Sequence, residues 1–410
     1  SKNNFSVIAK TYMLFSIPFM MLNFLLPVYT KKIGMNAIEF TGLFSLFSLI
    51  VMLIKPIIGK ISDKIGRKPL FVFSLLLYAV SFFVYSISKT QNEIYLARII
   101  QSFAAPFLGL TIDCMVADIS SEKLAERLGK LTVLSNQGGF VGIIIYFFLC
   151  NLLISFEEIW QVFFLIISGI NLIITIYSLV FLKETKTNLP ALQKTKAKAK
   201  TNFTPIMRKL LLIDFILSLF TSMLFPMFMY YLQDRYKANL YDIGIAYMLP
   251  QILLMFLSAK IGKYCDNHNK YKSMLISAFS SFVLFIIFPS LSVVTLSAVL
   301  YSIYAIANMQ FNLSSSAILF KEMHIEKRGE ITGIYATIIS FGSVIGPLIG
   351  GLLYNQISIS APFYACAIGY GIVGFLIFIL FKAECKQRIF SIPLFYTAKK
   401  PGSIINVGVA

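Results

Sequence analysis

Apolar and polar positions follow each other along this chain in long blocks. Twelve apolar stretches succeed one another, and short polar segments separate them. About 20 apolar residues in a helix are enough to cross the hydrocarbon core of a bilayer. The stretches must be helical, because an open strand leaves its backbone groups without partners in lipid. We therefore predict membrane-spanning helices at residues 8–29, 39–58, 70–88, 94–116, 131–153, 161–182, 210–232, 241–261, 272–290, 293–319, 331–354 and 361–382.

The composition favours a membrane protein and excludes two other classes. Of the 410 residues, 58% are hydrophobic and 13% are charged, whereas about 25% are charged in an average soluble domain. A soluble globule could not wet so much apolar surface, and disordered chains have low hydrophobicity. The basic start and first apolar run resemble a signal peptide, but the run ends in LLPVYTKK without a small-residue cleavage pattern. We predict that this run is retained as the first helix.

The net charge of +18 is distributed unevenly along the chain. If the N-terminus is cytoplasmic, the segments before, between and after the predicted spans on that side hold 29 of the 36 basic residues. Lysine and arginine accumulate on that side of membrane proteins. The pattern predicts a multi-pass protein of the plasma membrane with both termini in the cytoplasm. Because topology accounts for the charge, we expect the lipid bilayer as a partner and no nucleic acid.

The longest connection, residues 183–209, is rich in lysine and poor in apolar residues. We interpret it as a flexible cytoplasmic linker, and contact with anionic lipid headgroups is the alternative. The predicted organisation is an N-terminal six-helix bundle at 1–182, the linker at 183–209, a C-terminal six-helix bundle at 210–382 and a cytoplasmic tail at 383–410.

The two halves of the sequence resemble each other. The segment GKISDKIGRKP after the second span is matched by GKYCDNHNKYK after the eighth, with Gly59 and Gly262 separated by 203 residues. QGGFVGI in the fifth span matches FGSVIGP in the eleventh at a separation of 204 residues. Parallel repeats are typical of transporters whose halves enclose a site near the middle of the membrane.

The motif GKISDKIGRKP and two further motifs, YLARIIQSF (95–103) and GSVIGPLIGG (342–351), make the chain similar to the major facilitator superfamily over residues 8–382. The similarity is in particular to its twelve-span drug:proton antiporter branch. GKISDKIGRKP resembles the family signature between spans two and three, and YLARIIQSF (95–103) resembles the Arg-x-x-Gln pattern of proton-coupled members. GSVIGPLIGG (342–351) resembles the antiporter motif, although it lies in span eleven rather than span five. The resemblance implies an all-α membrane protein, with twelve transmembrane helices in two six-helix bundles related by a pseudo-twofold axis.

The resemblance also implies roles for individual residues. Asp63, Arg67 and Asp118 would form a charge cluster that gates the cytoplasmic side and locks the outward-open state, paired in one state and separated in the other. Glycines allow helices to approach closely, and Gly59 and Gly66 are the predicted gate glycines. The predicted helix-packing positions of the span-eleven motif are Gly342, Gly346, Pro347, Gly350 and Gly351.

Span four holds the most unusual charged groups. Arg98 and Asp113 are 15 residues apart, which is roughly 22 Å along a helix and about 60° around it, so both can face one cavity. Charges at membrane depth are costly and usually mark a transport pathway. We predict proton coupling by Asp113, tuned by Arg98, with Asp214 of span seven as a further coupling residue. The alternative for both acids is a carboxylate near a helix end that reaches interfacial water.

One face of span ten carries polar groups at helical spacing. They recur at i, i+3, i+7 and i+11, on one side of a helix: Tyr301, Tyr304, Asn308 and Asn312. The first-half positions 203 residues earlier are Arg98, Gln101, Ala105 and Gly109. Hydrogen bonding between helices is one interpretation. We prefer a substrate cavity, which would be lined by Gln101, Asn136, Gln137, Tyr301, Tyr304, Asn308 and Asn312.

The sequence carries no catalytic signature. It contains no GxxxxGK[ST] phosphate loop and no HExxH motif, and its five cysteines are scattered. We therefore expect no enzyme, no cofactor and no metal site. The leading hypothesis is a monomeric secondary transporter that exports hydrophobic or amphiphilic small molecules in exchange for protons. The alternatives are a proton symporter or uniporter that imports a small metabolite, such as an anion held by Arg98, and a transport-inactive receptor or lipid-handling scaffold.

Overall fold

The computed structural model describes residues 2–119, 124–152, 155–185, 203–322 and 328–382, and the regular structure in these ranges is helical. The first half contains α1 (Lys2–Phe15), α2 (Ile17–Lys32), α3 (Ala37–Ile65), α4 (Lys68–Ile87), α5 (Gln91–Ile119), α6 (Leu124–Leu152) and α7 (Phe156–Phe181). The second half contains α8 (Pro205–Tyr236), α9 (Leu240–Asn267), α10 (Lys270–Ile287), the short 3-10 helix η1 (Phe288–Ser290), α11 (Val294–Glu322), α12 (Arg328–Gln356) and α13 (Ala361–Leu380). The prediction of an all-helical membrane fold is confirmed.

The predicted spans coincide with these helices. Eleven stretches of the described chain are long and apolar enough to cross a membrane. The remaining predicted span, 131–153, lies in α6, whose apolar stretch among the described residues is Val133–Leu149. With 29 residues, α6 is still long enough to cross a core of about 30 Å at 1.5 Å per residue.

The first predicted span, 8–29, is wrong as a single continuous helix. The chain forms α1 and α2 with a break at Ser16. Pro18 lies in the first turn of α2, where it lacks the backbone N–H that a continuous helix would need. The Ser16 hydroxyl donates a hydrogen bond of 2.7 Å to the carbonyl of Tyr12. Proline and this side-chain bond together end α1 before α2 begins.

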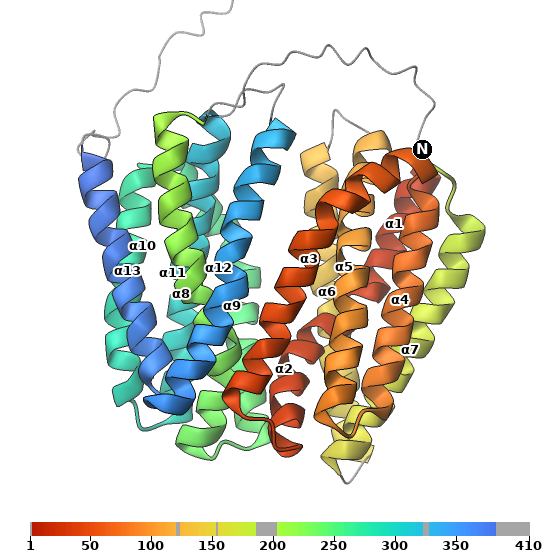
Figure 1. The fold of residues 1–410 in the computed structure, drawn as a ribbon, viewed down its shortest axis with the longest axis horizontal. Coiled ribbons are helices and arrows are strands. Elements are labelled where there is room, and N and C mark those ends of the chain that lie inside the picture. The colour runs from red at the N-terminus through yellow and green to blue at the C-terminus, as the bar shows by residue number, and fades with distance from the viewer. Residues whose placement is uncertain (1, 120–123, 153–154, 186–202, 323–327, 383–410) are drawn as a thin grey trace, which may run out of the picture.

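The helices form two groups that stand side by side, α1–α7 and α8–α13 (Figure 1). We call the end at which α1 begins, α7 ends and α8 begins the linker side, and the opposite end the far side. The two groups meet near the far side, where Phe40 stacks on Tyr230 with 4.5 Å between ring centroids. Gly351 of α12 lies there against Ala37 and Thr41 of α3. Toward the linker side α3 and α12 diverge (Figure 1).

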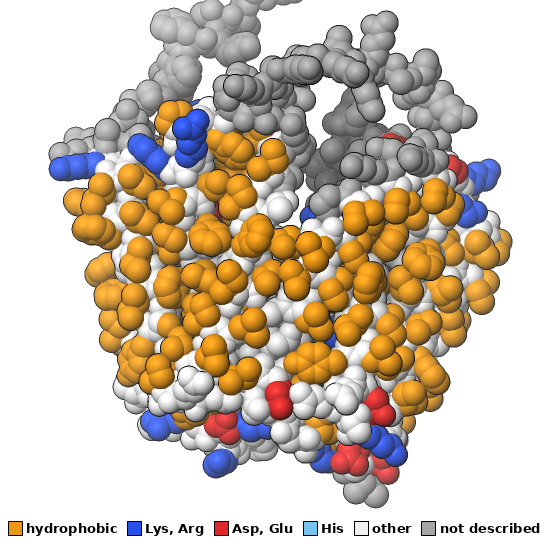
Figure 2. All heavy atoms as spheres, in the orientation of Figure 1, with side chains coloured by type: hydrophobic (Ala, Val, Ile, Leu, Met, Phe, Trp, Pro, Cys, Tyr) orange, Lys and Arg blue, Asp and Glu red, His pale blue; other side chains and the backbone are white. Residues whose placement is uncertain are grey.

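A broad apolar belt covers the face of the molecule seen in Figure 2, and charged side chains gather at its two ends. Large apolar side chains such as Ile144, Ile173 and Phe256 are exposed on the bundles. A belt of this kind matches the hydrocarbon core of a bilayer, so these helices contact lipid.

Glycines bring α6 of the first half close to the broken first helix. A Cβ added at Gly138 would collide with the carbonyl oxygen of Met13, and one added at Gly142 would collide with that of Ile17. Only a residue without a Cβ allows the two backbones to approach this closely.

The same packing recurs in the second half between α12 and α8. A Cβ at Gly346 would collide with Ser222, and one at Gly350 would lie 2.7 Å from the carbonyl oxygen of Met223. Gly342 lies against Ser218 of α8 in the same way. The glycines of α6 and α12 are 204 residues apart, so the repeat seen in the sequence corresponds to repeated helix packing.

Candidate functional site

A pocket of about 680 Å³ lies within the second bundle and is bordered by α3 of the first. Its walls come from α8, α9, α11 and α12, together with Phe44 and Ser48 of α3. Pro226, Pro250 and Pro347 lie inside α8, α9 and α12 and line the pocket. Because proline removes a backbone hydrogen bond and bends a helix, these three residues help to shape the space between the helices.

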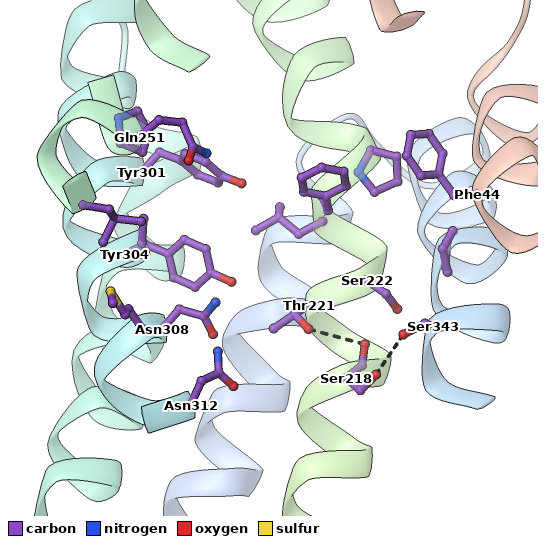
Figure 3. Close-up of a pocket in the computed structure, with 18 of the residues that line it drawn as sticks. Phe44, Ser218, Thr221, Ser222, Gln251, Tyr301, Tyr304, Asn308, Asn312 and Ser343 are labelled. Carbon is purple, nitrogen blue, oxygen red and sulfur yellow. Dashed lines mark hydrogen bonds between the residues drawn. The ribbon is translucent and has the colours of Figure 1, made fainter. Parts of the chain in front are cut away.

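One wall of the pocket carries aromatic and amide groups (Figure 3). Tyr304, Asn308 and Asn312 project from one face of α11 at intervals of four residues, as the sequence predicted for a helix. The side-chain oxygen of Asn308 accepts a hydrogen bond of 3.3 Å from the hydroxyl of Tyr370. With its oxygen in this contact, Asn308 can offer its NH₂ group to a ligand.

Four polar side chains on this wall have no hydrogen-bond partner among the described residues. They are the amides of Gln251 and Asn312 and the hydroxyls of Tyr301 and Ser316. The Tyr301 ring is fixed by stacking on Phe228, with 3.8 Å between centroids and 10° between planes. These groups face the pocket without a protein partner, so they are available to a ligand.

The opposite wall is built from α8 and α12 and carries hydroxyls that are already paired (Figure 3). Ser218 bonds to Ser343 at 3.1 Å. Thr221 donates to the carbonyl of Leu217, and Ser222 donates to the carbonyl of Gly342. These hydroxyls therefore join the helices and leave the α9–α11 wall as the hydrogen-bonding side.

None of the described residues that line the pocket carries a charge. The nearest acidic residue on α8 is Asp214, one helical turn from Ser218 in the direction of the linker side. Its carboxylate accepts hydrogen bonds from Ser315 of α11, at 2.7 Å, and from Tyr335 of α12, at 2.6 Å. Asp214 thus joins α8, α11 and α12 beside the pocket. No cationic side chain among the described residues pairs with its carboxylate.

Arg98 is buried in the first bundle, with 6% of its surface exposed. It donates to Gln101 at 2.9 Å and to the carbonyl of Leu43 at 3.4 Å. Its guanidinium also lies over the rings of Phe44 and Phe47, 5.0 and 4.4 Å from their centroids. Rings and amide oxygens stabilise this cation, which has no carboxylate partner among the described residues.

The predicted cavity residues of the first half lie elsewhere. Gln101 is buried and accepts hydrogen bonds from Arg98 and Tyr85, so it does not line the pocket. Asn136 and Gln137 are exposed on α6 and do not line it either. Asp113 is part of α5, but its side chain is outside the described part of the structure. The pocket is therefore formed almost entirely by the second half.

The loop between α3 and α4 brings part of the predicted gate together. The guanidinium of Arg67 lies 3.5 Å from the carboxylate of Asp118. Gly66 has a φ of +108°, a conformation that glycine adopts readily. Gly59 is part of α3, and its side-chain environment and that of Asp63 are outside the described residues.

Glu184 contributes to the same loop and was missed in the sequence. Its carboxylate accepts hydrogen bonds from the backbone N–H groups of Arg67, at 3.0 Å, and Lys68, at 3.1 Å. It therefore caps the N-terminus of α4, where the helix dipole favours an anion. The neighbouring Thr185 donates to Asp118 at 3.3 Å. The available signal was a single acidic residue at the start of an otherwise basic linker.

The protein consists of two bundles of membrane-spanning helices, with a pocket among the helices. This arrangement is that of a secondary transporter, which moves small molecules across a membrane without an enzymatic reaction. A profile of the Major Facilitator Superfamily matches residues 8–324 and 311–394. The chain belongs to this superfamily, as its motifs predicted.

Known relatives are similar over most of the chain. The quinolone resistance protein NorA of Staphylococcus aureus (strain MSSA476) is 26% identical over 381 residues, which cover 88% of this chain and 93% of the relative. Multidrug resistance protein 1 of Bacillus subtilis (strain 168) is 25% identical and covers 91% and 95%.

Solved structures show the same fold. The nucleoside transporter NupG matches with a TM-score of 0.71 and 17% identity over 94% of this chain and all of its own length (100%). An inward-facing bacterial homologue of the lysosomal transporter Spinster matches with a TM-score of 0.69 and 12% identity, over 92% of this chain and 96% of its own. At this level of identity the similarity concerns the fold alone.

Proposed function

We propose that this protein exports hydrophobic or amphiphilic small molecules in exchange for protons, by alternating access. The pocket is the observation that carries the proposal. Its volume of about 680 Å³ lies in the range of roughly 300–1,000 Å³ typical of drug-sized ligands. Its aromatic and amide wall faces apolar side chains of α3 and α8. The resistance functions in the names of two relatives support export.

The distribution of basic residues supports a cytoplasmic linker side and cytoplasmic termini. Because the bundles meet near the far side and diverge toward the linker side (Figure 1), this orientation makes the conformation inward-open. An exporter takes up its substrate from the cytoplasm or the inner leaflet in this state. We propose that it does so as a monomer in the plasma membrane.

Asp214 is our proposed proton acceptor in the second bundle, and Asp113 has this role in the first. Protonation of Asp214 would remove the anion to which Ser315 and Tyr335 donate. The contacts among α8, α11 and α12 would then change beside the pocket, which is how a proton could bias the two conformations. Arg98 would tune coupling in the first bundle, as its position in the Arg-x-x-Gln pattern suggests.

The proposed cytoplasmic gate is the cluster of Asp63, Arg67 and Asp118, with Gly59 and Gly66 at its turns. Arg67 and Asp118 are paired in the present conformation. Their pairing alone is therefore not unique to the outward-open state, and we propose that Asp63 makes the contact that changes.

Everted membrane vesicles test this function. Addition of an amphiphilic drug should release protons from acid-loaded vesicles that contain the parent protein. Asp214→Asn and Asp113→Asn should bring this release close to the level of empty vesicles, because an amide does not take up a proton at working pH. Glu157→Gln is the matched control, since Glu157 is an exposed acid at the start of α7. Proton release that persists in Asp214→Asn would refute its coupling role.

Import of an anion held by Arg98 is not favoured by the described contacts. The guanidinium is engaged by Gln101, by Leu43 and by two phenylalanine rings, and it does not line the pocket. Uptake of an anionic metabolite by whole cells, abolished by Arg98→Ala, would instead favour the importer.

A further inference from the structure

We propose that the pocket selects uncharged molecules that combine an aromatic or apolar body with a hydrogen-bonding edge such as a carboxamide. This inference deepens the proposed export function and rests on it for transport, while the binding preference stands on the pocket alone. The unpaired groups on the α9–α11 wall are those of Gln251, Tyr301, Asn312 and Ser316. They offer hydrogen-bond donors and acceptors but no charge.

A charged ligand would find no counter-ion among the described lining residues. An ion that leaves water for a sheltered site needs an opposite charge or many hydrogen bonds, and otherwise binding is costly. Asp214 does not fill this role, because it is outside the lining and its carboxylate already accepts bonds from Ser315 and Tyr335. Arg98 is likewise engaged within its own bundle.

The two walls also fix the orientation of a ligand. The hydroxyls of Ser218 and Ser222 are used in contacts between helices, so the polar edge of a ligand turns to the amides of α11. Its apolar body then lies against Phe44 and Phe225, whose rings are 6.0 Å apart. Figure 3 shows Phe44 across the pocket from Asn308 and Asn312.

The selection has an electrical consequence. Exchange of one proton for one neutral molecule moves a net positive charge into the cell, whereas exchange of one proton for one monovalent cation moves none. Export of a neutral substrate should therefore respond to the membrane potential as well as to the pH gradient.

Three naphthalene probes that differ only in charge test the preference. They are 2-naphthamide, 2-naphthylmethylammonium and 2-naphthoate. Binding to the purified protein in nanodiscs is measured by equilibrium dialysis against empty nanodiscs, without any gradient. We expect the carboxamide to bind tightest after the empty-disc signal is subtracted. Asn308→Leu and Asn312→Leu should each weaken it roughly three- to tenfold, the effect of one net hydrogen bond, whereas Asn267→Leu outside the pocket should not.

The inference fails if the carboxamide does not bind, if the ammonium probe binds as tightly, or if neither pocket substitution weakens the carboxamide. Transport is then measured in proteoliposomes with a potential set by potassium and valinomycin. Neutral selection at the pocket with no flux of any of the three probes would refute the export function and leave the binding preference intact. Flux of the ammonium probe alone would refute the preference and leave export intact.

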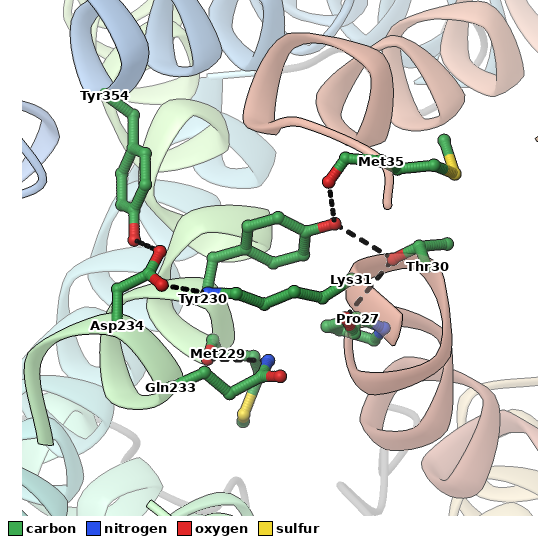
Figure 4. Close-up of polar contacts among 9 residues, drawn as sticks. All are labelled: Pro27, Thr30, Lys31, Met35, Met229, Tyr230, Gln233, Asp234 and Tyr354. Atoms are coloured by element: carbon green, nitrogen blue, oxygen red, sulfur yellow. Dashed lines mark hydrogen bonds and ion pairs between the residues drawn. The ribbon is translucent and has the colours of Figure 1, made fainter. Parts of the chain in front are cut away.

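A different set of contacts carries a second inference, at the far side (Figure 4). Lys31 at the end of α2 forms an ion pair with Asp234 of α8, and Tyr354 of α12 donates to the same carboxylate at 2.6 Å. Lys31 also lies over the ring of Tyr230, 5.1 Å from its centroid. The Tyr230 hydroxyl bonds across the bundles to Thr30 at 3.1 Å.

We infer that Lys31, Asp234 and Tyr354 form a latch that holds the far side closed. These residues join α2 of the first bundle to α8 and α12 of the second, so the two bundles cannot separate there while the ion pair persists. The side chains of Lys31 and Asp234 are 27% and 31% exposed. Partial burial and the added tyrosine bond make the pair stronger than a fully exposed one.

Spin labels on opposite bundles test the latch. Lys89→Cys and Ser290→Cys place them on the far side, in a chain whose native cysteines are replaced by alanine. We expect Lys31→Met and Asp234→Asn each to shift the distance distribution toward longer values and to lower the closed-to-open ratio roughly threefold or more. Combining both should add little, because each alone breaks the same pair.

Lys32→Met is the matched control. Lys32 is adjacent in sequence but pairs with Glu157 of its own bundle at 3.2 Å, so its loss should leave the distribution unchanged. The latch is wrong if the Lys31 and Asp234 variants match the parent, or if Lys32→Met shifts the distances as much as they do.

Discussion

The two bundles differ in how they use one face of two equivalent helices, α5 in the first bundle and α11 in the second. In the first bundle, the face of α5 is closed by Arg98 and Gln101, which are buried and bonded to each other. In the second, the corresponding face of α11 places Tyr304, Asn308 and Asn312 along an open pocket. The backbone arrangement was kept between the halves while the chemistry of the face changed.

The contrast shows which parts of the repeat depend on packing and which depend on function. Glycines at a separation of 204 residues bring α6 and α12 onto the first helix of their halves. A substitution there would force two backbones apart, so both halves retain glycine. Side chains that face the space between the bundles have no such constraint, because a cavity tolerates many different groups.

Valine at the glycine contacts should have the largest effect. Gly142→Val and Gly346→Val place a branched side chain against carbonyl oxygens of α2 and α8, and each should cost about 3 kcal/mol or more of stability. Thermal unfolding and folded yield in detergent measure the loss. Gly109→Ala and Gly169→Ala are controls, because open space surrounds an added Cβ at both positions. If only one half were sensitive, the packing would not be equivalent.

Arg98→Ala should affect stability, whereas Asn312→Ala should affect ligand binding. Loss of Arg98 leaves Gln101 with fewer partners and empties the space beside Phe44 and Phe47, which should cost about 2–4 kcal/mol. Asn312 is exposed in the pocket, so its truncation should change the unfolding free energy by about 0.5 kcal/mol or less. Unfolding curves and probe binding are measured on both variants. A stability loss in Asn312→Ala together with a binding loss in Arg98→Ala alone at unchanged stability would contradict this prediction.

The helix caps of α4 and α10 should have smaller and similar effects. Glu184, which follows the end of α7, caps α4, whereas Asn269 caps α10 from its own N-cap position. Glu184→Ala and Asn269→Ala should each cost about 1 kcal/mol. Unfolding midpoints measure both. Unchanged stability in Glu184→Ala would mean that the contact across the first bundle does not hold α4.

Lys55→Gln should have the smallest effect. Lys55 is exposed on α3, and a long lysine side chain can extend toward the membrane surface. The change in unfolding free energy should stay within about 0.5 kcal/mol, and drug export should match the parent. A clear loss of export would show that the first bundle contributes a functional cation other than Arg98.

Much of the fold could be predicted because a bilayer permits few structures. The apolar blocks gave the helices and their approximate ends, and the break at Ser16 was missed because the hydrophobic pattern continues through it. Tyr301, Tyr304, Asn308 and Asn312 were found by their helical spacing. Gln251 and Ser343 were not, because isolated polar residues in apolar helices carry no periodic signal.

The sequence by itself determined that this chain is a helical membrane transporter built as a repeat, because the length of apolar runs, glycine spacing and basic loops are local properties. Tertiary structure decided which polar residues meet. Lys31 and Asp234 are 203 positions apart, and Asp214 finds Ser315 and Tyr335 only when three helices pack together. Such contacts depend on how the helices rotate and tilt against one another, which the pattern of a single helix does not specify.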